Sequence, residues 1–93
     1  MKYRGTIKRI NDLLNKKMWN AAMQEMKLLP KGKTKNNFWK VILKDYLEHG
    51  WVESAKEISE KRLNRELTEG DKEIALSYYI EHKLWHKVCE MMT

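Results

Sequence analysis

Apolar residues recur along this chain at spacings of three and four, which is the pattern of amphipathic helices. The pattern also repeats at an offset of 33 residues, and three segments superpose at that offset without a gap. A repeat of this length is typical of stacked helical hairpins, each of which buries its apolar face against the next. Six columns are apolar in all three copies: Ile10, Leu43, Leu76; Leu13, Tyr46, Tyr79; Leu14, Leu47, Ile80; Met18, Trp51, Leu84; Trp19, Val52, Trp85; and Ala22, Ala55, Val88.

Each copy is interrupted once, at Lys17, Gly50 and Lys83. Glycine readily takes the left-handed conformation that ends a helix, so each unit should contain two helices, A and B, joined at this break. The predicted A helices cover 4–16, 37–49 and 71–82, and the predicted B helices cover 18–29, 52–66 and 85–92.

Helix starts and helix contacts follow from particular residues. Asn36 or Asn37 is expected to cap the second A helix, and the sequence TEGD from Thr68 has the form of a capping box for the third. The small residues Ala22 and Ala55 should lie where helices cross closely. Large residues are expected to fill the space beside them, namely Trp19, Trp51 and Trp85. The sequence therefore predicts an all-α fold of about three hairpins, in one domain over 1–93. Its units span about 1–34, 35–67 and 68–93, and the last is truncated.

The middle unit resembles a known class of repeats. Its segment FWKVILKDYLEHGWVESA, residues 38–55, is similar to the tetratricopeptide signature and also to a pentatricopeptide unit. The matching residues are Trp39, Ile42, Tyr46, Gly50, Val52 and Ala55. The other two units keep only the later half of the motif, with Thr6 and Lys72 in the place of its first tryptophan. The resemblance implies a right-handed helical-repeat array.

The two families imply different partners. Tetratricopeptide arrays usually bind proteins or peptides in a groove lined by A helices, whereas pentatricopeptide arrays bind single-stranded RNA through small polar residues near the start of each A helix. Ile7, Lys40 and Glu73 occupy that position here, which does not support a base-reading code. We therefore expect a protein or peptide partner. The residues expected to contact it are Arg4, Lys8, Asn11, Asn15, Asn37, Lys40, Lys44 and Glu48.

The charge distribution supports nucleic acid as an alternative partner. The formal net charge is +6, and residues 1–37 carry ten Lys and Arg against two acids, whereas residues 67–93 carry three against five. A localised basic surface is typical of proteins with an anionic partner, either RNA or an acidic protein. RNA held mainly by phosphate contacts would then meet the basic residues of the first third: Arg4, Lys8, Arg9, Lys31, Lys33 and Lys35.

No residue set predicts an enzyme, a cofactor or a metal. Gly32-Lys33-Thr34 spells the end of a phosphate-binding loop, but the required upstream glycine is replaced by Lys27, and a helical pattern precedes it. His82, His86 and Cys89 have metal-ligand spacing, but a helix break should separate the two histidines, and Cys89 is expected to be partly covered. The carboxylates Glu53, Glu57 and Glu60 lie beside Lys56, Lys61 and Arg62, as on an ion-paired surface.

Compartment and assembly follow from the remaining features. The single cysteine and the absence of a long apolar run predict a cytoplasmic protein without a membrane partner. The last B helix ends in apolar residues, where repeat arrays normally carry a polar cap. We therefore expect this end to pack on another copy of the chain, as a homodimer, or on a larger partner. The residues expected to mediate self-association are Trp85, Val88, Met91 and Met92.

Overall fold

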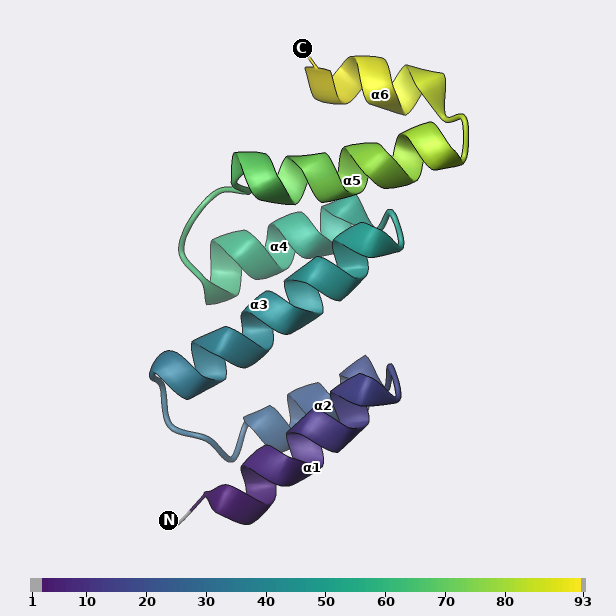
Figure 1. Ribbon diagram of the computed structural model, residues 1–93. Helices are drawn as coiled ribbons and strands as arrows, with labels where there is room; N and C mark the ends of the chain where they lie inside the picture. Colours follow the sequence, from purple (N-terminus) through teal and green to yellow (C-terminus); the bar gives the residue numbers. More distant parts are fainter. Residues whose placement is uncertain (1–2, 93) are drawn as a thin grey trace. The chain divides into compact units, whose positions relative to one another are not determined.

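The computed structural model describes residues 3–92, and over this range it is helical without a strand. The chain forms α1 (Arg4–Asn15), α2 (Trp19–Met26), α3 (Lys33–Glu48), α4 (Val52–Arg62), α5 (Glu69–Glu81) and α6 (Trp85–Met92) (Figure 1). The prediction of an all-α fold is confirmed.

Two compact units divide the chain between Ile42 and Leu43, within α3. The first unit holds α1, α2 and the beginning of α3, and the second holds the end of α3 with α4, α5 and α6. A single domain and a right-handed stacking of three hairpins stay predictions.

Three turns of the same geometry join α1 to α2, α3 to α4 and α5 to α6. The residues with positive φ are Lys17 (60°), Gly50 (76°) and Lys83 (57°), which lie 33 positions apart in the sequence. At the first turn, the amide of Met18 donates to the carbonyl of Leu13 (2.9 Å), and that of Lys17 donates to Leu14 (3.0 Å). The same pair of bonds recurs from Trp51 to Tyr46 and Gly50 to Leu47, and from Leu84 to Tyr79 and Lys83 to Ile80. This is the Schellman motif, in which a left-handed residue satisfies the last carbonyls of a helix.

The Schellman geometry explains two of the repeated apolar columns. The residue after the left-handed position normally contacts a residue in the last turn of the helix. At the second turn these residues are Trp51 and Tyr46, whose rings meet edge to face with centroids 5.5 Å apart. Trp51 is consequently a turn residue rather than the core residue that we expected, and its exposed fraction is 45%.

Three predicted helix boundaries are wrong. α2 ends at Met26 rather than at residue 29, because the amides of Lys27, Leu28 and Leu29 bond to carbonyls three residues back and tighten the chain ahead of Pro30. α4 ends at Arg62 rather than at residue 66, since Asn64 takes a left-handed φ of 53°.

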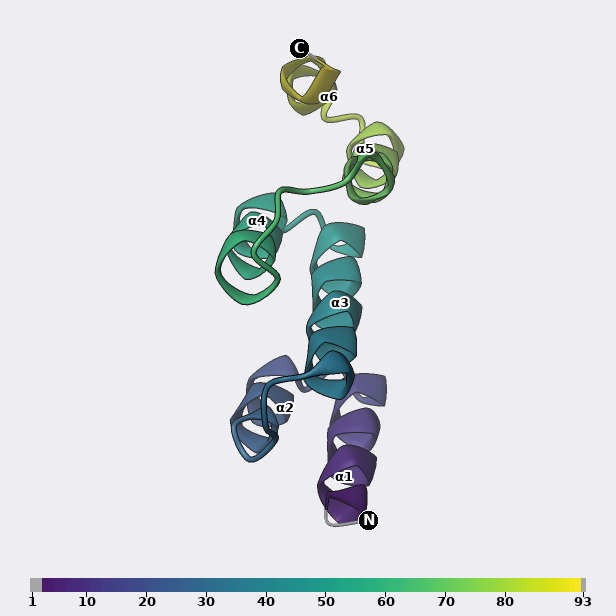
Figure 2. The ribbon, with the colours of Figure 1, turned by 90° about the vertical axis from the view of Figure 1, so that its left-hand side faces the viewer.

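The third wrong boundary is the start of α3. The helix begins at Lys33, so the expected caps Asn36 and Asn37 lie inside it. The amide of Asn36 donates to the carbonyl of Gly32 (3.0 Å), which closes the first turn four residues earlier than predicted. Nothing between Gly32 and Asn36 opposes a helix, because lysine is a good helix former and the last breaker is Gly32 itself. Figure 2 shows the connection from α2 to this start.

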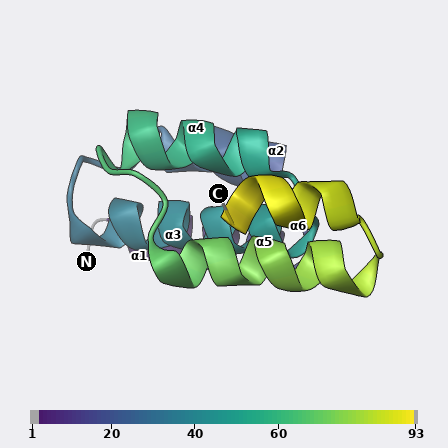
Figure 3. The same cartoon turned by 90° about the horizontal axis from the view of Figure 1, so that it is seen from above.

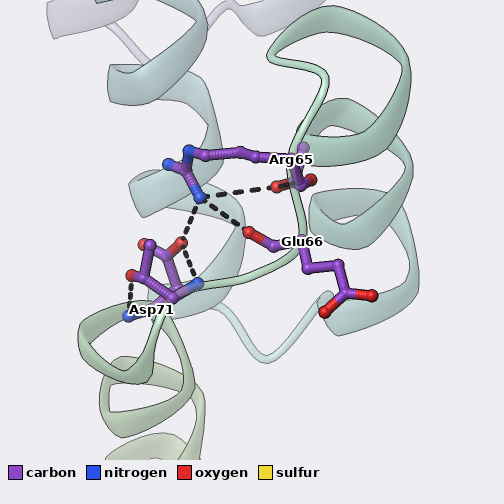
Figure 4. A network of polar contacts seen from close by, with 5 residues as sticks. Arg65, Glu66 and Asp71 are labelled. Atoms are coloured by element: carbon purple, nitrogen blue, oxygen red, sulfur yellow. Dashed lines mark hydrogen bonds and ion pairs between the residues drawn. The ribbon is translucent and has the colours of Figure 1, made fainter.

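The predicted capping box at the start of α5 is confirmed. The Thr68 hydroxyl accepts from the amide of Asp71 (3.1 Å), and the Asp71 carboxylate accepts from the amide of Thr68 (3.0 Å). Arg65 extends this arrangement, because its guanidinium donates to Asp71 Oδ2 (3.0 Å) and to the carbonyl of Glu66 (3.0 Å) (Figure 4). The loop between α4 and α5 is thereby fixed by polar contacts rather than by apolar packing.

In the first unit, α1 packs against α2 around the fully buried Ile10, Ala22 and Met26. Ala22 is buried as predicted, in the role of a small residue at a helix contact. Phe38 and Trp39 from the beginning of α3 are also buried, at 7% exposure each. Trp19 is half-buried.

In the second unit, the most buried apolar residues are Leu43, Leu47, Ala55 and Ala75. Gly50 lies against α5, where a Cβ added to it would overlap the ring of Tyr78. α6 lies alongside α5 after the turn at 82–84 but has no buried residue (Figure 3). Trp85 is 57% exposed, so the expectation that it fills a space in the core is wrong. Its replacement by alanine should cost well below the roughly 3–5 kcal/mol of a buried tryptophan.

Candidate partner-binding surface

Eight polar residues of α1 and α3 were predicted to face a partner, and all of them are exposed. We call this set the A-helix face. On α1 its members follow each other at helical spacings of three and four, which places them on one side of the helix. The same holds for α3. The α1 members are Arg4, Lys8, Asn11 and Asn15, and the α3 members are Asn37, Lys40, Lys44 and Glu48.

In the α3 part of the A-helix face, an ion pair is found only near the end of the helix. Lys44 and Glu48 form a long pair, with Nζ and Oε1 3.9 Å apart and both side chains exposed. Exposed pairs of this kind contribute little to stability and are easily exchanged for contacts with a partner. Lys40 and Asn37 precede them on the same side, so the face offers amide and ammonium donors along about three turns.

The six cations predicted for RNA do not all remain available. Arg9 pairs with Glu25 of α2 (3.2 Å) and also donates to the Thr6 hydroxyl (3.3 Å). Lys35 is half-buried and donates to the carbonyl of Leu29 (3.4 Å). These two side chains therefore hold α1 to α2 and the loop to α3. Arg9 is nevertheless exposed, as are the other four, Arg4, Lys8, Lys31 and Lys33.

The loop before α3 takes part in a pocket of the first unit that has a volume of about 340 Å³. Its apolar lining comes from Tyr3, Ile7, Leu29 and Pro30, and its charged lining comes from Lys31 and Lys33. We call it the loop pocket. Ile7 follows Arg4 on α1, so the loop pocket adjoins the A-helix face.

The loop pocket has one sign of charge. Two lysines line it together with apolar residues, and no carboxylate does. Within the described residues, neither lysine makes an ion pair. Such a site can accept an apolar side chain and an anion at the same time. The pocket was not predicted, because Tyr3 and Ile7 lie more than twenty positions before the loop; the available signal was the apolar Leu28-Leu29-Pro30 between basic residues.

A second cleft, of about 500 Å³, lies within the second unit between α4, α5 and α6. Lysines and carboxylates alternate around it, with Tyr79 of α5 among them. Burial raises the pKa of the Tyr79 hydroxyl, and the negative charges of Glu53 and Glu90 raise it further. The hydroxyl therefore stays protonated at neutral pH. Because four carboxylates and three lysines line this cleft, its charge gives little preference for either sign of ligand.

His49 and His82, which lie 33 positions apart, have the same structural role. His49 Nδ1 donates to the carbonyl of Asp45 (2.8 Å), and His82 Nδ1 donates to that of Tyr78 (3.0 Å). Both rings thus bond to carbonyls at the end of an A helix. The expected break between His82 and His86 is present, since α5 ends at Glu81 and α6 begins at Trp85. Over residues 3–92, no group of three or more His, Cys, Asp or Glu is placed to hold a metal ion.

Two other sequence-based expectations have mixed outcomes. On α4, Lys61 pairs with Glu57 at 3.0 Å with both side chains exposed, as an ion-paired surface requires. Cys89 was expected to be partly covered, and this is wrong, because the thiol is exposed on α6. α5, the other helix of this hairpin, covers too little of α6 to bury Cys89.

The residues predicted for self-association divide into two groups. Trp85 (57%) and Met92 (73%) are exposed, whereas Val88 and Met91 are half-buried. Ile80 of α5 is also exposed, at 47%. Its counterparts 33 and 66 positions earlier, Leu47 and Leu14, are buried. At this position of the repeat, the third copy therefore exposes an apolar side chain, whereas the first two copies bury theirs.

Comparison with protein-family models, curated proteins and solved structures finds no match to this chain. Across the part of the chain that the structure describes, every helix is too short or too polar to cross a membrane.

Proposed function

We propose that this protein is a non-enzymatic, tetratricopeptide-like interaction module of the cytoplasm that binds an acidic peptide or protein. The A-helix face and the basic first third provide the binding surface. The observation that supports this proposal best is the exposure of all eight residues of the A-helix face, on two helices that carry amides and lysines at helical spacing. Exposed side chains of this kind can recognise a partner by hydrogen bonds and charge.

Selection from a library of random displayed peptides tests the proposal. We expect the selected peptides to be enriched in Asp and Glu, because lysines predominate among the charged residues of the first third. Their dissociation constants, measured by fluorescence anisotropy, should rise about tenfold or more in Lys40→Glu/Lys44→Glu, since two attractive contacts become repulsive.

The matched control reverses two exposed lysines of α4, as Lys56→Glu/Lys61→Glu. It makes the same change in net charge outside the A-helix face, so binding should weaken much less. Equal weakening in both variants would mean that the total charge, and not the A-helix face, binds the peptides. A library that yields no binder would contradict the proposal.

RNA binding is the second candidate function. It is supported by the exposed cations that make no ion pair within the described residues, namely Arg4, Lys8, Lys31 and Lys33. If each contacts one phosphate, affinity for single strands should fall roughly 50-fold between 50 and 200 mM salt. A titration with labelled single-stranded RNA over this range measures the slope. RNA binding that is tighter than that of any selected peptide, with such a slope, would favour this function over the first.

A further inference from the structure

The loop pocket combines features that a flat charged surface lacks. Leu29 is buried at 6% exposure, and Ile7 and Tyr3 are half-buried, so apolar atoms line a concave site within an otherwise basic segment. Its volume of about 340 Å³ is at the low end for ligand sites. It has room for one or two large side chains and none for a folded element.

The charge of the pocket selects among apolar ligands. Lys31 and Lys33 stand beside the apolar lining, and both side chains are exposed. The sequence of the first unit contains two acidic residues, Asp12 and Glu25. Glu25 is already paired with Arg9. A ligand that enters the pocket therefore gains most if it carries negative charge next to its apolar part.

The character of the lining distinguishes a peptide from a nucleic acid. Single-stranded nucleic acid binds on exposed aromatic faces, on which successive bases stack. Here three of the four apolar residues are aliphatic, and only Tyr3 could stack a base. Aliphatic walls suit leucine or phenylalanine side chains equally well, so the lining favours a peptide.

We propose that the loop pocket is the anchor site for the partner, and that it takes one or two large apolar side chains of a peptide flanked by acidic residues. This inference rests on the proposed function, and it names the chemical class of the partner. The apolar side chains enter between Ile7, Leu29 and Pro30, and the flanking carboxylates meet Lys31 and Lys33. The A-helix face then orients the remainder of the peptide.

The test uses the full chain and a fluorescein-labelled peptide with a Leu-Phe pair between two acidic residues on each side. We expect micromolar binding by anisotropy. The same peptide with Ser-Ser in place of Leu-Phe, and the same peptide with Gln in place of its acids, should each bind about tenfold more weakly or worse. In nuclear magnetic resonance spectra, the amides of Ile7, Gly32 and Lys33 should shift on titration.

Lys31→Glu/Lys33→Glu should weaken binding of the probe about tenfold or more, and circular dichroism should show an intact fold. The fold should persist because an acidic residue in the first turn of α3 suits the helix dipole better than Lys33 does. Ile7→Gln is the second variant and removes part of the apolar lining without a change in charge. Lys16→Glu/Lys27→Glu is the matched control, because it makes the same change in net charge at two exposed lysines of the same unit outside the pocket.

The outcomes separate this inference from the proposed function. If the display-selected peptides lose affinity in Lys40→Glu/Lys44→Glu but neither they nor the probe respond to Lys31→Glu/Lys33→Glu, the interaction module stands and the pocket is overturned. Equal binding of the Leu-Phe and Ser-Ser peptides would also overturn the pocket. A uridine hexamer that displaces the probe more strongly than unlabelled peptide would assign the site to nucleic acid and overturn both.

Discussion

At the scale of single residues, the left-handed positions determine where each hairpin turns. Two of the three are lysines, although a residue with a Cβ loses roughly 1–2 kcal/mol in this conformation. Lys17 and Lys83 are retained at that cost, whereas the middle turn has Gly50. The structure gives a reason for glycine there, because a Cβ at Gly50 would overlap the ring of Tyr78.

Substitutions at Gly50 and Lys83 should therefore have opposite effects. Gly50→Ala should lower the free energy of unfolding by about 2–4 kcal/mol, since the new Cβ is strained at φ 76° and overlaps the Tyr78 ring. Lys83→Gly should leave stability unchanged or raise it by up to about 1 kcal/mol. Urea denaturation followed by circular dichroism measures both. A Gly50→Ala protein as stable as the original would contradict the close approach of Tyr78.

At the scale of elements, a polar cap can determine where a helix begins. Asp71 shows this for α5. Partial burial acts to raise its pKa, but the hydrogen bonds from the Thr68 amide and the Arg65 guanidinium outweigh burial, and the pKa of Asp71 is lowered. The ionised carboxylate thus holds the start of α5 and the loop before it.

This lowered pKa predicts an acid-sensitive helix start. Because the pKa is lower in the folded than in the unfolded chain, the stabilisation is complete above the ordinary Asp pKa of about 4, and it is lost as the pH falls through the lowered pKa. Asp71→Asn should lose roughly 1–2 kcal/mol at pH 7 and should show a smaller decline in stability between pH 4 and 2. Thermal unfolding across this pH range measures both effects.

The matched control is Glu69→Gln, which removes a neighbouring but exposed carboxylate with only a long pair to Lys72 (3.7 Å). It should retain the acid dependence. Equal pH profiles for Asp71→Asn and the original chain would show that other carboxylates cause the decline.

The sequence predicted those elements whose ends depend on neighbouring residues. Thr68 and Asp71 are three positions apart, and the left-handed Gly50 lies next to its hydrogen-bonding partners, so local chemistry was sufficient for both. Asn36 was predicted to be a cap because asparagine favours that position. Asparagine is also tolerated inside a helix, and here the helix is capped earlier, at Gly32, whose carbonyl accepts from the amide of Asn36.

Features that depend on contacts between residues far apart in the sequence could not be predicted from local sequence patterns. The exposure of Trp85 depends on what covers α6, and periodicity carries no information about that. The loop pocket joins Tyr3 to Pro30, which no spacing rule relates. The A-helix face was predictable as exposed positions, because helical spacing alone places polar residues on one side.

At the scale of the whole molecule, the excess of positive charge lies in one part of the sequence, whereas exposed apolar side chains such as Leu28 and Trp85 occur in both units. The excess of lysine and arginine lies in residues 1–37, whereas α5 and α6 contribute the exposed Ile80, Trp85 and Met92. Partner binding and self-association would therefore use different parts of the chain.

Self-association through α6 predicts a mass that rises with concentration. We expect multi-angle light scattering to show dimers at high concentration, and Trp85→Glu should abolish them by placing a charge on the exposed apolar surface. Leu28→Glu is the matched control, since Leu28 is equally exposed (59%) but belongs to the first unit. A monomer at every concentration, or the same loss in both variants, would contradict association through α6.

The Schellman turns also bear on how fast the chain folds. Each turn leaves only three residues between two helices, namely 16–18, 49–51 and 82–84. Closing such short loops costs little chain entropy, and helical chains rich in local contacts reach their folded state in microseconds to milliseconds. Because α6 has no buried residue, we expect it to open and close without the rest of the chain. A partner that covers α6 would then bind a helix that already exchanges between folded and unfolded forms.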